Sequence, residues 1–316
     1  MERRMTSLSS SIPNTPLDPD DCLRRLRARY PDLPIQRYMV FTNGWDSLAL
    51  ALDDTWLVRF ARRPDVEAQL VVESHLLPAL APALPAPIPH FELIGDLGAR
   101  GLTFAGYRLL PGVPLPATLA ATPNHIPALA RQIAAFLGAL HAFPLERAAA
   151  AVAPLALPSE GAGAGPHRHY ADLYEYVRAR VFPLLDAPTQ ARAAAFWEPF
   201  LADDAYFAFR PALIHADLAG EHILCDPATG ALTGIIDWGD ARAGDPALDF
   251  TGLLRDAGPA FAEAALAAYP GPVDPAFRRR MDFYARLIPY HEVRFGLDTH
   301  QLDHLARGLA AIRAAE

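Results

Sequence analysis

Residues 214–250 read IHADLAGEHILCDPATGALTGIIDWGDARAGDPALDF, and this stretch decides the fold. Two apolar runs, ILC and LTGII, flank the turn PATG, which is the pattern of a β-hairpin. Folding about that turn sets Asp237 opposite about Gly220 and within about two residues of His222. Asp217 lies in the loop that feeds the first strand. The sequence therefore predicts that three polar side chains meet at the open end of an apolar hairpin.

The residues His215, Asp217, His222 and Asp237 allow two chemistries. A catalytic zinc site needs about three protein ligands and a water, and this set offers enough donors, although the spacing HxDx4H does not identify zinc. Phosphoryl transfer needs a carboxylate to accept the proton of a hydroxyl, and further donors for a divalent ion on the phosphates. The set suits phosphoryl transfer better. For His215 alone, hydrogen bonds to backbone carbonyls are favoured over direct chemistry.

The N-terminal part reads as β-rich. Residues 38–60 predict two strands, LALAL and TWLVRF, joined at Asp53-Asp54. A helix is expected after Pro64-Asp65, because a proline and an acid suit a first turn. Glu73 falls on the apolar stripe of that helix, where a carboxylate needs a partner. Arg59 is the expected partner, since a cation that reaches phosphates must be steadied by a helix carboxylate.

The character of the chain changes after a joint at residues 107–112, where the apolar segment LTFAGYRLLPG ends. One amphipathic helix follows, marked by Ile133, Phe136, Leu137 and Leu140, and residues 170–202 and 276–316 also carry helical patterns. Ala148–Gly165 is an Ala/Pro/Gly tract that is expected to be a loop or insertion without chemistry. Strands followed by helices predict an α+β fold with a β-rich N-terminal lobe and a mainly helical C-terminal lobe.

The composition excludes several classes of protein. A net charge of −8 and a pI near 5.8 provide no broad basic field for nucleic acid, and they suit cationic small molecules. All 28 basic residues are arginine, so arginine must fill any role usual for lysine. Cys22 and Cys225 lie outside any CxxC pair, which fits a reducing cytoplasm. We expect residues 1–18 to be a loose tail, and neither a signal peptide nor a membrane span.

The segments HADLAGEHIL and GIIDWGDARAGDPALDF resemble the paired motifs of the aminoglycoside/macrolide phosphotransferase family, which includes antibiotic-resistance enzymes. The blocks NGWDS, LVRFARRP, VVESHLLPAL and GYRLLPG resemble the same family in the same order, from about residue 38 to 298. The resemblance implies a two-lobed protein-kinase-like fold. Its parts are a nucleotide-binding lobe at 19–106, a hinge at 107–112 and a catalytic and acceptor-binding lobe at 113–316.

The resemblance also implies an activity and the roles of individual residues. The expected reaction moves the γ-phosphate of ATP or GTP, with Mg²⁺ as cofactor, to a hydroxyl of an aminoglycoside, macrolide or similar acceptor. Asp217 matches the catalytic base, and Asp237 matches the aspartate that holds the metal. His215 matches a histidine that shapes the catalytic loop, and Asp249 matches an aspartate that braces it.

On the nucleotide side, Arg59 matches the phosphate-contacting cation and Glu73 matches its helix partner. Residues 107–110, which include Tyr107 and Leu109, match the linker whose backbone contacts the nucleobase. Asn43 and Gly44 match the phosphate loop, but that loop has a single glycine, and Asn43-Gly44 equally suits a plain hairpin turn.

His222 stands where most relatives carry an asparagine as the second metal ligand, although some macrolide-kinase-like members also have histidine. Magnesium prefers hard oxygen ligands, whereas imidazole suits softer ions. Two roles are open for His222: it binds the metal weakly, or it bonds a phosphate or Asp217 instead.

The acceptor is expected between Asp217 and the C-terminal helices. Glu292 and Asp298, in the segment HEVRFGLD, and Asp240 are candidates to attract the ammonium groups of a cationic acceptor. The same charges also suit a solvated helix face, and an apolar lining would favour a macrolide. Two other functions are weighed, a nucleotide-binding pseudokinase and a metal-dependent hydrolase. The presence of both Asp217 and Asp237 argues against the pseudokinase.

The histidine at position 222 leads to a first prediction. We expect the activity to survive with His222 in place and manganese to be tolerated unusually well, because imidazole suits a softer ion than magnesium. The measurement is the transfer rate with Mn²⁺ against Mg²⁺ in the wild type and in His222→Asn. Equal or weaker activity in manganese, together with a neutral substitution, would contradict this expectation.

Overall fold

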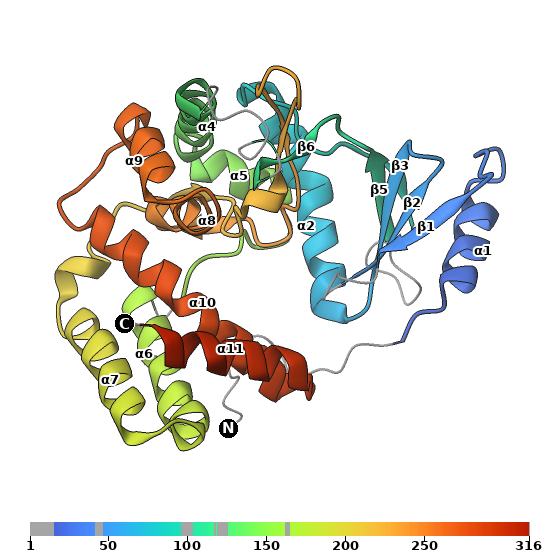
Figure 1. Cartoon of the computed structure of the whole chain (residues 1–316). Coiled ribbons are helices and arrows are strands. Elements are labelled where there is room, and N and C mark those ends of the chain that lie inside the picture. Colours follow the sequence, from blue (N-terminus) through green and yellow to red (C-terminus); the bar gives the residue numbers. More distant parts are fainter. Residues whose placement is uncertain are drawn as a thin grey trace.

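A five-stranded antiparallel sheet forms the N-terminal part of the molecule, in the order β1-β2-β3-β5-β4 (Figure 1). The computed structural model describes residues 16–41, 47–95, 104–116, 118, 126–161 and 165–315. The strands of the sheet are β1 (Tyr38–Phe41), β2 (Ser47–Leu52), β3 (Trp56–Ala61), β4 (Phe91–Ile94) and β5 (Phe104–Arg108). The predicted hairpin with a turn at Asp53-Asp54 is confirmed as β2 and β3, in which Leu52 pairs with Trp56.

Two predictions near the N-terminus need correction. Residues 38–60 contain three strands instead of two, because Tyr38–Phe41 pairs with β2 as the edge strand of the sheet. Asp18, assigned to the tail, accepts a hydrogen bond from the Asp20 amide at 3.0 Å and caps α1 (Pro19–Arg29). The strand Tyr38–Phe41 has only four residues and Asp18 is a single polar cap, so neither gives a clear periodic signal.

The two faces of the sheet meet different helices because alternate residues of a strand point to opposite faces. Leu50 and Phe60 pack toward α1. Leu57 and Ala61 face the cluster that includes α2 (Pro64–Leu80), and Arg59 lies between them on the same face. The predicted helix after Pro64 is confirmed, and its stripe of Val66, Leu70, Glu73 and Leu77 is buried. Helix α2 lies between the sheet and the helical part (Figure 1).

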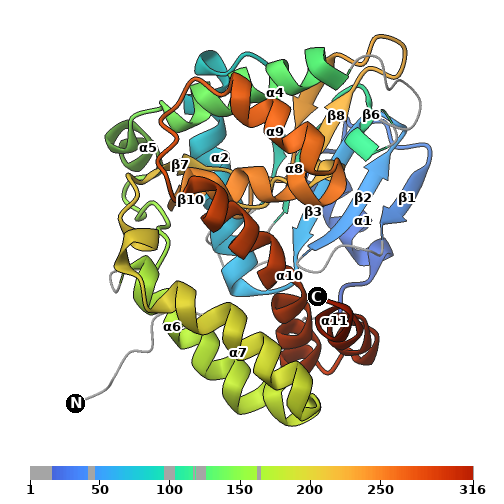
Figure 2. The ribbon, with the colours of Figure 1, turned by 60° about the vertical axis from the view of Figure 1, so that its left-hand side comes forward.

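Helices dominate the C-terminal part, where α6 runs beside α7 and α10 leads into α11 (Figure 2). The α-helices are α4 (Ile126–His141), α5 (Leu145–Val152), α6 (Pro166–Tyr176), α7 (Ala187–Leu201), α8 (Thr251–Asp256), α9 (Pro259–Ala268), α10 (Phe277–Thr299) and α11 (Leu302–Ala314). Shorter helical turns are η1 (Ala81–Ala83), η3 (Val177–Val181), η4 (Phe182–Leu184), η5 (Asp204–Phe207), η6 (Gly220–His222) and η7 (Pro246–Phe250). The predicted order of strands and then helices is confirmed.

Two small β-sheets also belong to the C-terminal part. One has the order β6-β8-β9, with β6 (Val113–Pro114), β8 (Ile223–Cys225) and β9 (Leu232–Ile235). The other pairs β7 (Ala212–Ile214) with β10 (Arg242–Gly244). The hairpin predicted around PATG is therefore confirmed as β8 and β9.

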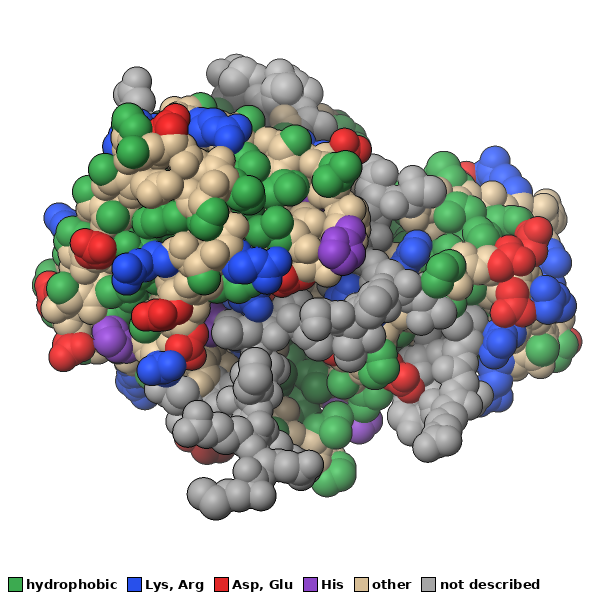
Figure 3. Space-filling view, turned by 90° about the horizontal axis from the view of Figure 1, so that it is seen from below, with side chains coloured by type: hydrophobic (Ala, Val, Ile, Leu, Met, Phe, Trp, Pro, Cys, Tyr) green, Lys and Arg blue, Asp and Glu red, His purple; other side chains and the backbone are tan. Residues whose placement is uncertain are grey.

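Acidic and basic side chains are interspersed on the face shown in Figure 3.

The Ala/Pro/Gly tract at Ala148–Gly165 differs from the expected loop. Its first residues belong to α5, where Ala148 and Val152 are fully buried, because alanine is a strong helix former and fits a tight interface. Further along, the Glu160 carboxylate accepts hydrogen bonds from Tyr170 at 2.5 Å and from the Asp245 amide at 3.2 Å. The tract therefore contributes to the core.

Among the described residues, no single helix has the length and apolar composition of a membrane span, and the pair α4 and α5, which reaches that length together, is bent by 71°.

A buried ion pair joins the start of η7 to α10. The Arg280 guanidinium binds both oxygens of Asp245, at 2.5 and 3.2 Å, and Asp274 from its other side at 2.8 Å. The side chain of Asp245 is fully buried, and its Oδ2 also accepts a hydrogen bond from Tyr284 at 2.9 Å. Asp245 caps η7, and Pro246 follows as the first residue of this turn.

Removing the cation of this pair leaves a buried carboxylate without compensation. We expect Arg280→Met to lower the free energy of unfolding by about 3–5 kcal/mol, measured by denaturant titration. The matched control is Arg278→Met, which breaks an exposed pair with Glu263 and should leave stability close to that of the wild type. Equal losses in the two variants would show that the burial of Asp245 is not the cause.

Candidate active site

The loop between β7 and β8 places Asp217 at the end of the hairpin. Its start is held by the buried Asp249 carboxylate, which accepts hydrogen bonds from the amides of His215 at 2.9 Å and Ala216 at 2.7 Å. Ala216 adopts a left-handed conformation with φ of 67°, which turns the chain out of the strand. The Asp217 side chain is consequently presented at the surface and is 53% exposed.

His215 uses both ring nitrogens within the fold. Its Nε2–H donates to the carbonyl of Ile236 at 3.0 Å, and its Nδ1 accepts the amide of Asp217 at 3.3 Å. Burial lowers the pKa of His215 to about 4, so the ring is neutral. A ring with both nitrogens engaged has no lone pair for a metal, and His215 joins the loop that carries Asp217 to the β8–β9 hairpin.

Asp249 has a partner that sequence reasoning missed. His141, at the end of α4, lies with its Nε2 3.0 Å from Asp249 Oδ2 and its Nδ1 2.7 Å from the hydroxyl of Tyr269. Burial opposes the charged form of Asp249, but His141 and His215 outweigh it and hold the pKa of this carboxyl below its usual value. The sequence does contain a signal for His141: it is a polar residue on the apolar stripe of a helix, which is the same pattern that identifies Glu73.

His222 lies between the two carboxylates of the site. Its Nδ1–H donates to the backbone carbonyl of Asp217 at 2.7 Å, and its Nε2 lies 3.6 Å from Asp237 Oδ2. The amide of Ile236 donates to the His222 carbonyl at 2.9 Å, so Asp237 lies across from Glu221, one residue from the expected register. Two roles are open for His222, a weak metal ligand or a hydrogen-bond partner of a phosphate or Asp217. The structure shows a hydrogen bond to Asp217, and it goes to the backbone carbonyl of that residue and not to its carboxylate.

The charges of the site shift its acid–base properties. The side chain of Asp217 is half-exposed, and partial withdrawal of its carboxyl from water raises its pKa to about 7; the His222 imidazole opposes this shift and the carboxylates of Asp240 and Asp237 reinforce it. Burial also opposes the charged form of Asp237, but Arg59 and His222 hold its pKa below the usual value. The pKa values of Asp217 and Asp237, which lie in the same site, are therefore shifted in opposite directions.

Arg59 connects the N-terminal sheet to this hairpin. Its Nη2 binds both oxygens of Glu73, at 2.6 and 2.5 Å, and its Nη1 binds Asp237 Oδ1 at 2.9 Å. Burial disfavours the cation, but the Glu73 and Asp237 carboxylates outweigh it and raise the pKa of Arg59. The expected pair of Arg59 with Glu73 is present, and the contact with Asp237 extends it across the two parts of the molecule.

Two of the other nucleotide-side candidates, Tyr107 and Leu109, lie in and just after β5, an inner strand of the sheet. Tyr107 is inside β5, with its ring buried 6.0 Å from that of Phe91. Leu109 is 40% exposed, and its amide donates to the carbonyl of Thr55 at 2.8 Å, so this amide is not available to a nucleobase. Asn43 and Gly44 lie outside the described residues.

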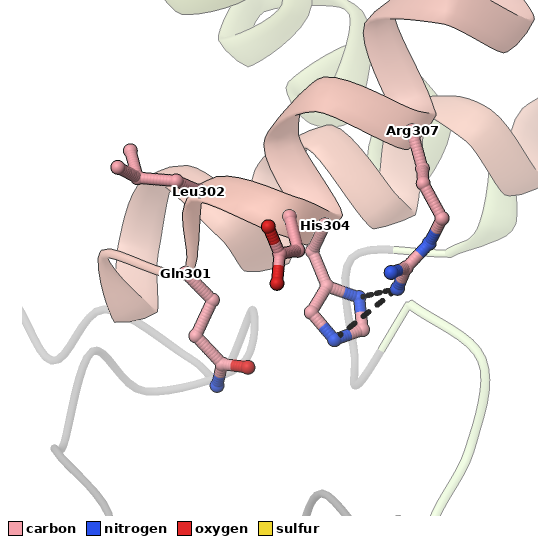
Figure 4. A pocket seen from close by; sticks show the side chains of 5 residues that line it. Gln301, Leu302, His304 and Arg307 are labelled. Carbon is pink, nitrogen blue, oxygen red and sulfur yellow. Dashed lines mark hydrogen bonds between the residues drawn. The ribbon is translucent and has the colours of Figure 1, made fainter.

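The three acidic acceptor candidates already have partners of their own. Asp298 binds Tyr176 at 2.9 Å and Arg294 at 3.4 Å, and Asp240 accepts a hydrogen bond from Gln69 at 3.4 Å. Glu292 binds Arg307 at 2.9 Å and lies 3.4 Å from His304. Arg307 and His304 line the hollow where α11 begins, and their side chains point toward one another in Figure 4. Glu292 and Asp298 are therefore neutralised within the chain.

A metal at this site would have few protein ligands. Within the described residues, no group of three or more His, Cys, Asp or Glu side chains is arranged to hold an ion. Asp237 offers hard oxygen, and the nearby Nε2 of His222 is a second donor. The carboxylate of Asp237 fits Mg²⁺ shared with phosphates and water, since that ion is usually bound by one or two carboxylates plus substrate oxygens, whereas the imidazole is the weaker match for this ion.

The sequence and the fold of this chain are similar to those of known phosphotransferases. The sequence pattern described as the phosphotransferase enzyme family matches residues 37–283. Viomycin phosphotransferase from Streptomyces vinaceus is 30% identical over 165 residues, which is 51% of this chain and 53% of that protein. An uncharacterised protein of Bacillus subtilis is 30% identical over 119 residues, which is 37% of this chain and 39% of the relative. The chain thus spans about half or less of these two relatives.

Solved structures match over nearly the whole chain. An aminoglycoside phosphotransferase in complex with GDP and kanamycin is 27% identical, with a TM-score of 0.84 over 93% of this chain and 97% of that chain. Macrolide 2'-phosphotransferase type I has a TM-score of 0.74 at 23% identity, over 96% of this chain and 100% of that chain, and this likeness shows the fold alone. The expected fold is confirmed.

The forked contact of Arg59 suggests a test. We expect Arg59→Lys to raise the nucleotide concentration for half-maximal thermal stabilisation about 10-fold, because Arg59 uses two nitrogens, Nη1 on Asp237 and Nη2 on Glu73, whereas a lysine has a single nitrogen and lacks the planar fork. Arg37→Lys is the control, since Arg37 pairs with Asp54 on the surface of the sheet. Wild-type nucleotide affinity in Arg59→Lys would show that the fork is not needed.

Proposed function

The chain belongs to the phosphotransferase enzyme family, and on that premise we propose that it transfers the γ-phosphate of ATP or GTP to a hydroxyl of an aminoglycoside, macrolide or similar small molecule. The observation that carries this proposal is the convergence of Asp217, Asp237 and Arg59. His222 lies within 3.7 Å of Asp217 and 3.6 Å of Asp237, and Arg59 lies 2.9 Å from Asp237.

Asp217 is the proposed base. Its carboxylate is exposed, and its pKa of about 7 allows it to accept a proton from the acceptor hydroxyl near neutral pH. The loop that carries it is held by buried groups, so the carboxylate is oriented before the acceptor arrives.

Asp237 is the proposed ligand of Mg²⁺, with His222 as a second donor, and Mn²⁺ is a candidate substitute because of the imidazole. When bound, the metal would offset the negative charge of the phosphates. Arg59, steadied by Glu73, would contact the same phosphates, since its guanidinium can bind two oxygens at once.

Several observations support the choice of donor and acceptor. Relatives were solved with GDP, with ATP and with aminoglycosides, which is why both nucleotides and these acceptors are proposed here. Asp240 lies close enough to Asp217 to influence its pKa, which keeps it as an acceptor candidate.

A cytoplasmic location remains our proposal, consistent with two free, buried cysteines.

Two alternatives have different consequences. A zinc hydrolase would need about three protein ligands, and both nitrogens of His215 are already hydrogen-bonded within the fold. A pseudokinase would bind nucleotide without turnover. Tightly bound stoichiometric zinc would support the hydrolase, whereas magnesium-dependent stabilisation by nucleotide supports the kinase.

A turnover screen tests the proposal directly. The protein is mixed with ATP or GTP, Mg²⁺ and a panel of aminoglycosides, macrolides and simple amino-alcohols, and phosphorylated product is measured. We expect Asp217→Ala to lower kcat by about 10²–10⁴-fold, because it removes the general base. Asp282→Ala, an exposed position on α10, is the control. Full activity of Asp217→Ala would remove this residue from its assigned role.

A further inference from the structure

We propose that Asp256 is a second positioning residue of the catalytic loop, which holds the amide of Gly220 as Asp249 holds the amides of His215 and Ala216. The role rests on the proposed function, because the alignment of this loop affects turnover only if Asp217 acts on an acceptor. Asp256 ends α8 and lies seven residues after Asp249.

The two aspartates hold opposite ends of the loop. Asp249 accepts the two amides that precede Asp217, at 2.9 and 2.7 Å. Asp256 Oδ2 accepts the amide of Gly220 at 2.7 Å, three residues after Asp217. Asp217 therefore sits between two points at which the backbone is fixed by a carboxylate.

The segment from Asp249 to Asp256 lies directly against the loop. A Cβ on Gly252 would approach the carbonyl oxygen of Leu218 to 1.9 Å, so a side chain cannot fit there. A Cβ on Gly220 would lie 2.9 Å from the Cβ of Asp256. Spacings of three and four residues place Asp249, Gly252 and Asp256 on one side of the helical segment. The backbone contact at Gly252 and the two carboxylates thus form a single interface with the loop.

Arg255 keeps the Asp256 carboxylate charged. Its Nε and Nη2 bind the two oxygens of Asp256 at 2.5 and 2.7 Å. Burial opposes the charged form of Asp256, but Arg255 and the Gly220 amide hold its pKa below the usual value. The bond to Gly220 therefore has an ionised acceptor, which makes it shorter and stronger than a neutral one.

A displacement of Gly220 would reach both functional side chains of the loop. The Ala219 amide donates to the Asp217 carbonyl at 2.8 Å, and the His222 amide donates to the Ala219 carbonyl at 3.0 Å. His222 Nδ1 donates to the same Asp217 carbonyl at 2.7 Å. These bonds make residues 217–222 one compact turn, so its position depends on the bond to Asp256.

The first test compares kcat and KM in three variants. We expect Asp256→Ala to lower kcat by about 10–100-fold with little change in KM for nucleotide, because a misplacement of about 1 Å affects transfer and leaves binding intact. Asp256→Asn keeps an oxygen for the Gly220 amide and should recover most of the loss. Glu263→Ala, which breaks a comparable bidentate pair with Arg278 on the surface, should match the wild type. Wild-type kcat in Asp256→Ala would overturn the proposal.

The second test needs no acceptor and separates this proposal from the function on which it rests. Hydrogen exchange at the Gly220 amide is measured in the same variants, with thermal unfolding as the measure of global stability. Faster exchange in Asp256→Ala, with unfolding like that of Glu263→Ala, supports the clamp even if no acceptor is phosphorylated by the wild type. Unchanged exchange at Gly220, or faster exchange over the whole C-terminal part, overturns it.

Discussion

The hydrogen bonds of the buried Asp249 carboxylate are the interaction on which the loop carrying Asp217 depends. This carboxylate is shielded from water, and a charge in that position is tolerated only because each oxygen accepts a backbone amide and His141 adds a third donor. The same bonds turn the chain at Ala216 and direct Asp217 outward. Folding stability and the direction of the functional side chain therefore come from one set of contacts.

A second set of charges joins the two parts of the molecule. Arg59 and Asp237 are 178 residues apart in the chain, and their pairing couples β3 to the β8–β9 hairpin. Glu73 anchors the guanidinium from α2, so the cation reaches Asp237 without losing its own partner. This arrangement places one positive group among carboxylates, where the phosphates of a nucleotide would add further negative charge.

His222 lies between Asp217 and Asp237 and contacts both residues. Its Nδ1 is occupied by the Asp217 carbonyl, which orients the ring, and its Nε2 faces Asp237. Burial opposes its charged form, but Asp217 and Asp237 raise the pKa of His222. The ring is thus part of the backbone geometry of the loop and also a side-chain neighbour of the proposed metal ligand.

The sequence by itself determined the elements whose signals are local. The turn PATG between apolar runs predicted the hairpin and its register to within one residue, because strand period and turn chemistry are properties of neighbouring residues. The apolar stripe of α2 identified Glu73 as a buried carboxylate in need of Arg59. The resemblance added roles for Asp217 and Asp237, and the structure places these two residues on either side of His222.

Only the tertiary structure decided which charges remain available and what holds the loop. Glu292 and Asp298 look alike as acidic residues on a helix, yet one is neutralised by α11 and the other by Tyr176 and Arg294. Glu160 and Asp256 stand in segments without a motif, and their partners lie far along the chain. A pairing of that kind leaves no periodic trace in the sequence, because it depends on how separate elements pack and not on the residues beside each member.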